Sequence, residues 1–357
     1  MLDFTPAGGR PHPCGEEVLY DFEVDRVAEE ILRRGVKRVL LQFPEGLRGR
    51  ALSIVKRLSE RVDAEFLVSG DPCYGACDLP LWQGRSLGVD LIVHYGHSPM
   101  MEETNPPVLY VEARAEMDVE EVVRRAVPLL GGAKVVGLAS TVQHLSQLRR
   151  AERILSEEGK EVRVGGRSGR VTYPGQVLGC DYSSPLSVAG EVEVFLFIGG
   201  GSFHPLGLSL ATEKDVVTAD PYTGKVGRIG EKDRMRVAKR RWATISAARQ
   251  AERFGIIMGL KAGQRRPTAV RALKGKLEEE GKEVLLLCME EVNFENLANF
   301  TEIEAFIETA CPRIAIDGIE GLRQPLLTGE EALVMLGELD WGEVWRATFG
   351  GIRWTWE

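Results

Sequence analysis

The chain has 357 residues, enough for two or three domains, and its content of 44% hydrophobic and 27% charged residues is typical of globular proteins. Its 53 acidic and 45 basic residues give a net charge of −8, which argues against direct nucleic-acid binding because phosphate neutralisation needs a basic surface. We find no pattern of a secretory signal and no uninterrupted apolar segment of membrane-spanning length, so we expect a cytoplasmic protein.

A unit of strand, turn, helix and second strand occurs three times along the chain. The copies run from Arg38 to Gly70, from Lys134 to Gly166 and from Phe254 to Cys288. Each copy opens with a continuous apolar run, which is typical of a strand buried on both faces. The hexapeptide EEGKEV occurs in the second and third copies, where Gly159 and Gly281 are expected to be left-handed helix caps.

Short apolar segments after each copy predict further strands. They are residues 89–95, 108–113, 192–200, 215–220, 305–310 and 313–317. Strands that alternate with helices indicate parallel sheets with right-handed crossovers. We therefore expect an α/β fold of three similar small domains, each a mostly parallel sheet flanked by helices, over residues 1–115, 116–222 and 223–357.

A basic amphipathic helix, roughly Glu231 to Arg253, is expected to lead into the third domain. Its cluster of Lys239, Arg240 and Arg241 is expected on a solvated face, with docking to an acidic protein surface as the functional alternative.

Four of the six cysteines lie in loops that follow predicted strands, next to Gly or Pro. Cys73 and Cys77 lie in GDPCYGACD, Cys180 in LGCDYSS and Cys311 in ETACPRIAID. In parallel α/β sheets, ligand-binding groups gather in the loops beyond the carboxyl ends of the strands. Three domains that meet at such loops would build one central site.

The other two cysteines have simpler interpretations. Cys288 lies within the apolar run LLLCME and is expected to be a buried core thiol, whereas Cys14 lies in a Pro- and Gly-rich lead-in and is interpreted as incidental. Thiolates select zinc or iron–sulfur clusters. A structural zinc site usually has four ligands in closely spaced pairs, so widely separated cysteines favour a cluster, with a zinc-binding three-domain interaction module without redox chemistry as the alternative.

Five segments carry a resemblance to a known family. They are Leu41–Leu47, Ser69–Asp78, Leu178–Ser184, Ile198–Gly207 and Ala310–Gly318. In their order and spacing, the chain resembles the archaeal diphthamide-biosynthesis enzymes of the 2-(3-amino-3-carboxypropyl)histidine synthase family, which are non-classical radical S-adenosylmethionine enzymes. Together with the threefold repeat, the resemblance covers nearly the whole chain.

The resemblance implies that one cysteine from each domain holds a 4Fe–4S cluster: Cys77, Cys180 and Cys311, with Cys73 as an accessory thiol. S-adenosyl-L-methionine would be the co-substrate, and an electron from the cluster would release methylthioadenosine and a 3-amino-3-carboxypropyl radical. The radical would add to a histidine of translation elongation factor 2, the first step of diphthamide biosynthesis. The family further implies a homodimer, and the cluster needs an electron donor that the sequence does not identify.

Several other residues are candidates for cofactor binding. Gly199, Gly200 and Gly201 follow an apolar strand and could cradle a ligand, although a tight turn would need the same residues. We expect no strong helix after this loop, which argues against a dinucleotide fingerprint. The remaining candidates, each with a structural alternative, are His204 in the same loop, Gln42 in the first strand-to-helix turn, and Arg313, whose guanidinium could bind the methionine carboxylate.

Overall fold

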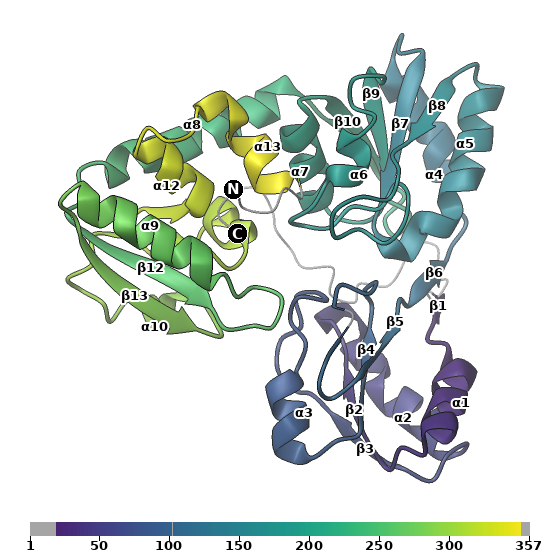
Figure 1. Cartoon of the computed structure of the whole chain (residues 1–357). Coiled ribbons are helices and arrows are strands. Elements are labelled where there is room, and N and C mark those ends of the chain that lie inside the picture. Colours follow the sequence, from purple (N-terminus) through teal and green to yellow (C-terminus); the bar gives the residue numbers. More distant parts are fainter. Residues whose placement is uncertain (1–18, 102, 351–357) are drawn as a thin grey trace.

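The computed structural model describes residues 19–101 and 103–350 (Figure 1). Three separate sheets, one in each third of the chain, form the centres of three lobes. This arrangement confirms the predicted α/β fold of mostly parallel sheets flanked by helices. The three predicted domain ranges stay a prediction, and one strand of the middle sheet, at Val226–Ile229, lies beyond the expected break near residue 222.

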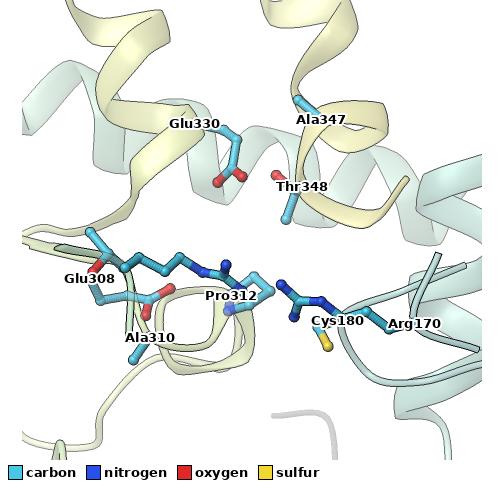
Figure 2. A pocket seen from close by; sticks show the side chains of 10 residues that line it. Arg170, Cys180, Glu308, Ala310, Pro312, Glu330, Ala347 and Thr348 are labelled. Atoms are coloured by element: carbon cyan, nitrogen blue, oxygen red, sulfur yellow. The ribbon is translucent and has the colours of Figure 1, made fainter. Parts of the chain in front are cut away.

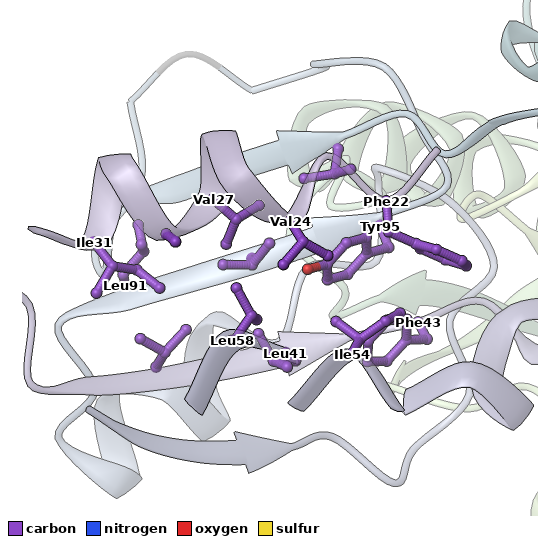
Figure 3. Close-up of a cluster of buried hydrophobic side chains, with 14 of the residues drawn as sticks. Phe22, Val24, Val27, Ile31, Leu41, Phe43, Ile54, Leu58, Leu91 and Tyr95 are labelled. Atoms are coloured by element: carbon purple, nitrogen blue, oxygen red, sulfur yellow. The ribbon is translucent and has the colours of Figure 1, made fainter. Parts of the chain in front are cut away.

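The first sheet is parallel throughout. Its strands in spatial order are β3 (Glu65–Val68), β2 (Arg38–Gln42), β4 (Leu91–Tyr95) and β5 (Val108–Val111). The helical segments around it are α1 (Val24–Arg34), η1 (Glu45–Arg50), α2 (Ala51–Ser59) and α3 (Leu81–Leu87). Ile31 of α1 and Ile54 and Leu58 of α2 pack with Leu41 and Leu91 in the core of this lobe (Figure 3).

A two-stranded antiparallel ribbon connects the first lobe to the second. It pairs β1 (Leu19–Asp21) with β6 (Arg114–Glu116). The second sheet has the order β11 (Val226–Ile229), β10 (Asp215–Ala219), β9 (Val194–Ile198), β7 (Val135–Ser140) and β8 (Glu161–Val164). β11 pairs antiparallel with β10, and the other strand pairs are parallel. Its helical segments are α4 (Glu120–Ala126), η2 (Val127–Leu130), η3 (Val142–Gln147), α5 (Leu148–Glu157), α6 (Ser183–Leu186) and α7 (Phe203–Thr212).

The third sheet is again parallel. Its order is β13 (Glu283–Met289), β12 (Arg253–Gly259), β14 (Ala305–Glu308) and β15 (Leu326–Thr328). Its helical segments are α8 (Glu231–Ala248), α9 (Pro267–Glu279), α10 (Phe294–Leu297), α11 (Pro312–Asp317), α12 (Gly329–Met335), η4 (Trp341–Glu343) and α13 (Val344–Phe349).

The repeated unit is present in all three lobes. The pairs β2–β3, β7–β8 and β12–β13 are parallel, and each pair is connected through a helix. Gly159 and Gly281 follow the connecting helices with φ of 72° and 77°, so the predicted left-handed caps are confirmed.

Two segments are helical where the sequence predicts a strand or no strong helix. Residues 313–317 were expected as a strand but belong to α11, because Pro312 at the first helical position favours a helix start and Cys311 is its extended N-cap. The glycine loop is followed by the ten-residue helix α7, although the sequence predicts no strong helix there. α7 is almost entirely buried, so its apolar side chains give no amphipathic pattern in the sequence.

Two burial predictions are also wrong. Cys288 is exposed, because β13 is an edge strand whose Leu285 and Leu286 are exposed as well. Arg241 is buried, not solvated: its guanidinium pairs with Glu331 at 2.5 Å and donates to the carbonyls of Ala315 and Leu326 at 2.7 Å each. A buried guanidinium needs this full set of acceptors, and they come from elements far away in the sequence.

Among the described residues, no helix is long and apolar enough to cross a membrane. Cys14 lies outside the described residues.

Candidate functional site

The three cysteines proposed from the sequence lie in loops beyond strand ends, one in each lobe. Cys77 lies between β3 and α3, Cys180 lies between β8 and α6, and Cys311 is the N-cap between β14 and α11. Each loop follows the carboxyl end of a parallel strand. This is the edge of an α/β sheet at which ligand-binding residues collect.

The three thiols influence one another electrostatically. Burial is the largest cause that raises the pKa of each thiol, and it brings that of Cys180 to about 11. The charge of Cys77 also raises the pKa of Cys180, and the charges of Cys180 and Cys77 raise that of Cys311. Because charge effects weaken with distance, these mutual effects indicate that the three thiols lie near one another.

A loop of the third lobe packs directly against Cys77. Gly263, between β12 and α9, donates its backbone N–H to the Cys77 carbonyl at 2.8 Å. The neighbouring Gln264 lies with its Nε2 3.4 Å from the Cys77 Sγ. A Cβ at position 263 would lie 2.6 Å from the Cys77 Cα, so this close approach requires glycine.

A half-buried lysine reinforces the same contact between the first and third lobes. The Lys261 ammonium lies 2.7 Å from an Asp78 carboxylate oxygen and 2.6 Å from one of Glu291. It also lies over the Tyr74 ring, 4.9 Å from its centroid. The residues on both sides of Cys77 are thereby fixed against the third sheet.

Hydrogen bonds shape the other two cysteine loops. The Cys311 N–H donates to the Glu308 carboxylate at 2.8 Å. In the second lobe, the Asp181 carboxylate accepts from the N–H groups of Arg170 and Ser183, each at 2.8 Å, which fixes the turn beside Cys180. Both turns depend on a carboxylate that accepts backbone donors near a cysteine.

A pocket of about 40 Å³ lies beside Cys180 and next to Cys311. Arg170 and Cys180 approach it from the second lobe, and Glu308 and Glu330 from the third (Figure 2). Arg266 also lines it. Burial raises the pKa of Glu330 to about 7 and that of Glu308 well above its usual value. The pocket therefore combines guanidinium groups with carboxyl groups that bind a proton readily.

The proposed cofactor residues occupy several different environments. Gln42 ends β2, is buried, and donates its amide to the Asp78 carbonyl at 2.7 Å, next to Cys77. Arg313 pairs with Asp317 at 2.9 Å, as in the structural alternative, and its guanidinium lies 3.3 Å from the centroid of the Phe203 ring. A Cβ at Gly179 would lie within 3.3 Å of both side chains, so Phe203 and Arg313 border the loop of Cys180.

The glycine loop between β9 and α7 is closely packed. A Cβ at Gly200 would lie 2.9 Å from the Tyr222 ring, and a Cβ at Gly199 would lie 3.0 Å from the Phe197 ring. Gly201 has φ of 77°. His204 is the second residue of α7, and burial lowers its pKa to about 3. Packing alone explains the first two glycines, so their role in ligand binding remains a proposal.

Comparison with known proteins identifies the family. Residues 43–346 match the family model described as "Putative diphthamide synthesis protein". The chain belongs to this family. Over 322 residues it is 38% identical to the 2-(3-amino-3-carboxypropyl)histidine synthase of Pyrococcus horikoshii. The match covers 90% of this chain and 92% of that protein. The chain is also 32% identical to subunit 1 of the corresponding synthase of Schizosaccharomyces pombe, over 92% of this chain and 77% of that protein.

Solved structures of a diphthamide synthesis protein have the same fold. The crystal structure of Dph2 from Pyrococcus horikoshii has a TM-score of 0.82 and 37% identity over 90% of this chain and 92% of that chain. A second crystal structure of that Dph2 contains a 4Fe–4S cluster. It has the same TM-score and identity, and the match covers 90% of this chain and 93% of that chain. These relatives confirm the family and enzyme class that the sequence predicts.

The sequence analysis does not identify several residues that line or contact this site. Arg170, Arg266, Glu308 and Glu330 line the pocket, but no motif or periodicity marks them. Gln264 and Gly263 contact Cys77 from the third lobe. Only Glu308 could have been identified, from its position: it ends a strand three residues before Cys311.

Proposed function

We propose that this protein transfers the 3-amino-3-carboxypropyl group from S-adenosyl-L-methionine to a histidine of translation elongation factor 2, the first step of diphthamide biosynthesis. The observation that carries this proposal is the convergence of Cys77, Cys180 and Cys311 from three sheets. It occurs in a chain that is similar over nine-tenths of its length to a named synthase and to a structure with a 4Fe–4S cluster.

The residues present fit such a cluster. Three thiols are the soft ligands that iron–sulfur clusters require, and all three are only partly exposed. When bound, a reduced 4Fe–4S cluster would supply the electron that cleaves the bond from the sulfonium to the methionine γ-carbon. Cys77, Cys180 and Cys311 would hold it, and three protein ligands leave one iron open to the co-substrate.

The pocket beside Cys180 suits the amino-acid end of the co-substrate. Arg170 and Arg266 offer guanidinium groups for the α-carboxylate, and Glu308 and Glu330 offer carboxyl groups for the α-ammonium. Gly199, Gly200, Gly201, His204 and Arg313 remain the proposed contacts for the rest of the molecule.

Gln42 has a different proposed role from the one expected. Its amide is bonded to the Asp78 carbonyl and to His94, so it positions the Cys77 loop and does not reach a ligand.

The reaction also implies partners. An electron donor must reduce the cluster, and the protein substrate must reach the centre between the lobes. The exposed apolar side chains of Leu285, Leu286 and Phe294 near the edge strand β13 support the proposal of a homodimer. We place the protein in the cytoplasm, where its substrate, a translation factor, works.

The experiment is anaerobic turnover with a chemical reductant, S-adenosyl-L-methionine and elongation factor 2. We expect methylthioadenosine as the nucleoside product and one 3-amino-3-carboxypropyl group on a histidine of the factor, both by mass spectrometry. Methylthioadenosine without added reductant would instead indicate polar transfer, and 5′-deoxyadenosine as the main product would contradict the proposed bond cleavage. A colourless protein that binds zinc through the three cysteines would favour the interaction module.

A further inference from the structure

A second group of metal-ligating side chains lies in the first lobe, apart from the three cysteines assigned to the cluster. One ligand atom each from Cys73, His94 and His97 lies within 4.8 Å of the others. Cys73 lies in the loop after β3, His94 lies in β4, and His97 follows β4 directly. Since β3, β2 and β4 are parallel neighbours, their carboxyl ends bring these side chains to one edge of the sheet.

Gln42 fixes the orientation of His94. The Gln42 Nε2 donates to the Asp78 carbonyl, which can only accept, so its Oε1 must face the His94 Nδ1 at 2.6 Å. The His94 Nδ1 therefore carries the proton and donates it to Gln42. This leaves a lone pair on the His94 Nε2. Metal-bound histidines commonly show this arrangement, with the outer ring nitrogen bonded to a carbonyl or carboxylate oxygen.

His97 directs a second nitrogen to the same point. Its Nδ1 lies 3.0 Å from the His94 Nε2 and donates a hydrogen bond to it in the metal-free protein, so a bound metal ion would take the place of this proton. In tetrahedral zinc sites, with Zn–N of about 2.0–2.1 Å and Zn–S of about 2.3 Å, ligand atoms lie roughly 3.3–3.6 Å apart. The observed separations, from 3.0 Å to at most 4.8 Å, include this range.

The surroundings hold both parts of this site in place. The loop with His97 is bound from the second lobe, where Gln143 donates to the Gly96 carbonyl and Gln176 donates to the Ser98 hydroxyl, each at 2.6 Å. Cys73 is buried and belongs to the same loop as Cys77. A metal ion bound here would tie the Cys73–Cys77 loop to β4.

We propose that the Cys73 Sγ, the His94 Nε2 and a His97 ring nitrogen form a second metal site, which binds a divalent transition metal of the zinc type. Thiolate and imidazole groups both bind zinc, and three protein ligands leave a fourth position open. The ion braces the loop of Cys77 and keeps Cys73 away from the cluster. The proposal concerns the fold of the first lobe and does not depend on the reaction.

The test uses cluster-loaded full-length protein to which one equivalent of zinc sulfate is added before desalting. Elemental analysis should find one zinc ion per chain in addition to the cluster iron. Zinc-edge X-ray absorption should show one sulfur at about 2.3 Å and two nitrogens at about 2.0–2.1 Å. Cys73→Ser and His97→Gln should lose the zinc and keep the iron, whereas the exposed control Cys288→Ser should keep both.

Three results would overturn the proposal. The first is wild-type protein that retains no zinc after desalting. The second is zinc with only oxygen and nitrogen neighbours that persists in Cys73→Ser, which would indicate adventitious surface binding. The third is a Cys73→Ser variant that loses iron and keeps zinc, which would make Cys73 a cluster ligand. The X-ray absorption spectrum of the wild type tests the ligand set directly, so this test holds even if His97→Gln fails to fold.

Discussion

At the scale of single residues, the three proposed cluster ligands share one chemical property. Burial raises the pKa of Cys77, Cys180 and Cys311, so each thiol keeps its proton at neutral pH when no cation is near. A metal ion reverses this preference, because the thiolate is the form that binds metals. The three sulfur atoms thus form a place where a cation is favoured.

We predict that Cys77→Ala, Cys180→Ala and Cys311→Ala each lose cluster iron and turnover, because a three-thiolate site has no spare ligand. Cys288→Ala is the matched control: its thiol is exposed, so iron content should be retained and the free energy of unfolding should change by less than about 0.5 kcal/mol. Iron and sulfide analysis after anaerobic reconstitution measures the outcome. Loss of iron from Cys288→Ala with retention in Cys311→Ala would show that the ligand assignment is wrong.

Single residues also show what the sequence could predict. The Gly and Pro neighbours of Cys77, Cys180 and Cys311 mark strand-end loops, and the structure has loops there. The apolar run around Cys288 could not distinguish an edge strand from a central one, since that depends on strand order. The burial of Arg241 depends on Glu331, which lies 90 residues away in the sequence, so no local pattern reveals it.

At the scale of elements, the loop from β12 to α9 decides how the third lobe meets the Cys77 loop. Its contact is made by backbone atoms, through the hydrogen bond from Gly263 to the Cys77 carbonyl. Such a contact leaves no periodic signal in the sequence. The repeat and the left-handed caps were predictable because they depend on residues within one element.

Gly263→Ala adds only one methyl group, but it should disturb the site strongly. The new Cβ would lie 2.6 Å from the Cys77 Cα and 2.8 Å from its Cβ, so one loop must move away. We expect a loss of about 1–3 kcal/mol in the free energy of unfolding and lower iron content after reconstitution. Urea denaturation and iron analysis measure the two effects.

The control for this substitution is Gly275→Ala within α9. A Cβ at position 275 meets no atom within 4 Å, and alanine favours a helix over glycine by about 0.5–1 kcal/mol. This variant should be as stable as the wild type or more so, with full iron. Equal behaviour of the two variants would mean that the close approach at Gly263 does not support the Cys77 loop.

At the scale of the whole molecule, polar contacts connect the lobes. Between the first and second lobes, the Tyr20 hydroxyl donates to Tyr222 at 3.2 Å, and the Tyr222 hydroxyl lies 2.9 Å from the His144 Nε2. In one arrangement of the protons, Tyr222 accepts from Tyr20 and donates its own proton to the His144 Nε2, so that the His144 proton lies on Nδ1. Among the described residues, that Nδ1 has no hydrogen-bond partner. In this arrangement His144 is neutral, which agrees with its burial.

The burial of His144 predicts acid sensitivity at the junction of the first two lobes. Burial lowers the pKa of His144 from 6.5 to about 4, so the folded state binds this proton less readily than the unfolded state. The stabilisation is fully present above pH 6.5 and is lost as the pH falls through 4. The difference corresponds to about 3 kcal/mol. We expect the free energy of unfolding of the wild type, measured with urea, to fall over this range more steeply than that of His144→Gln.

The comparison of these two pH profiles removes effects that both proteins share, including those of other buried groups. Tyr222→Phe provides a further control. Burial lowers the pKa of His144, and the bond to Tyr222 does not, so this variant should be less stable by about 1 kcal/mol at neutral pH and keep the wild-type acid dependence. If His144→Gln and the wild type lost stability in parallel between pH 6.5 and 4, the neutral histidine would not be what makes this junction sensitive to acid.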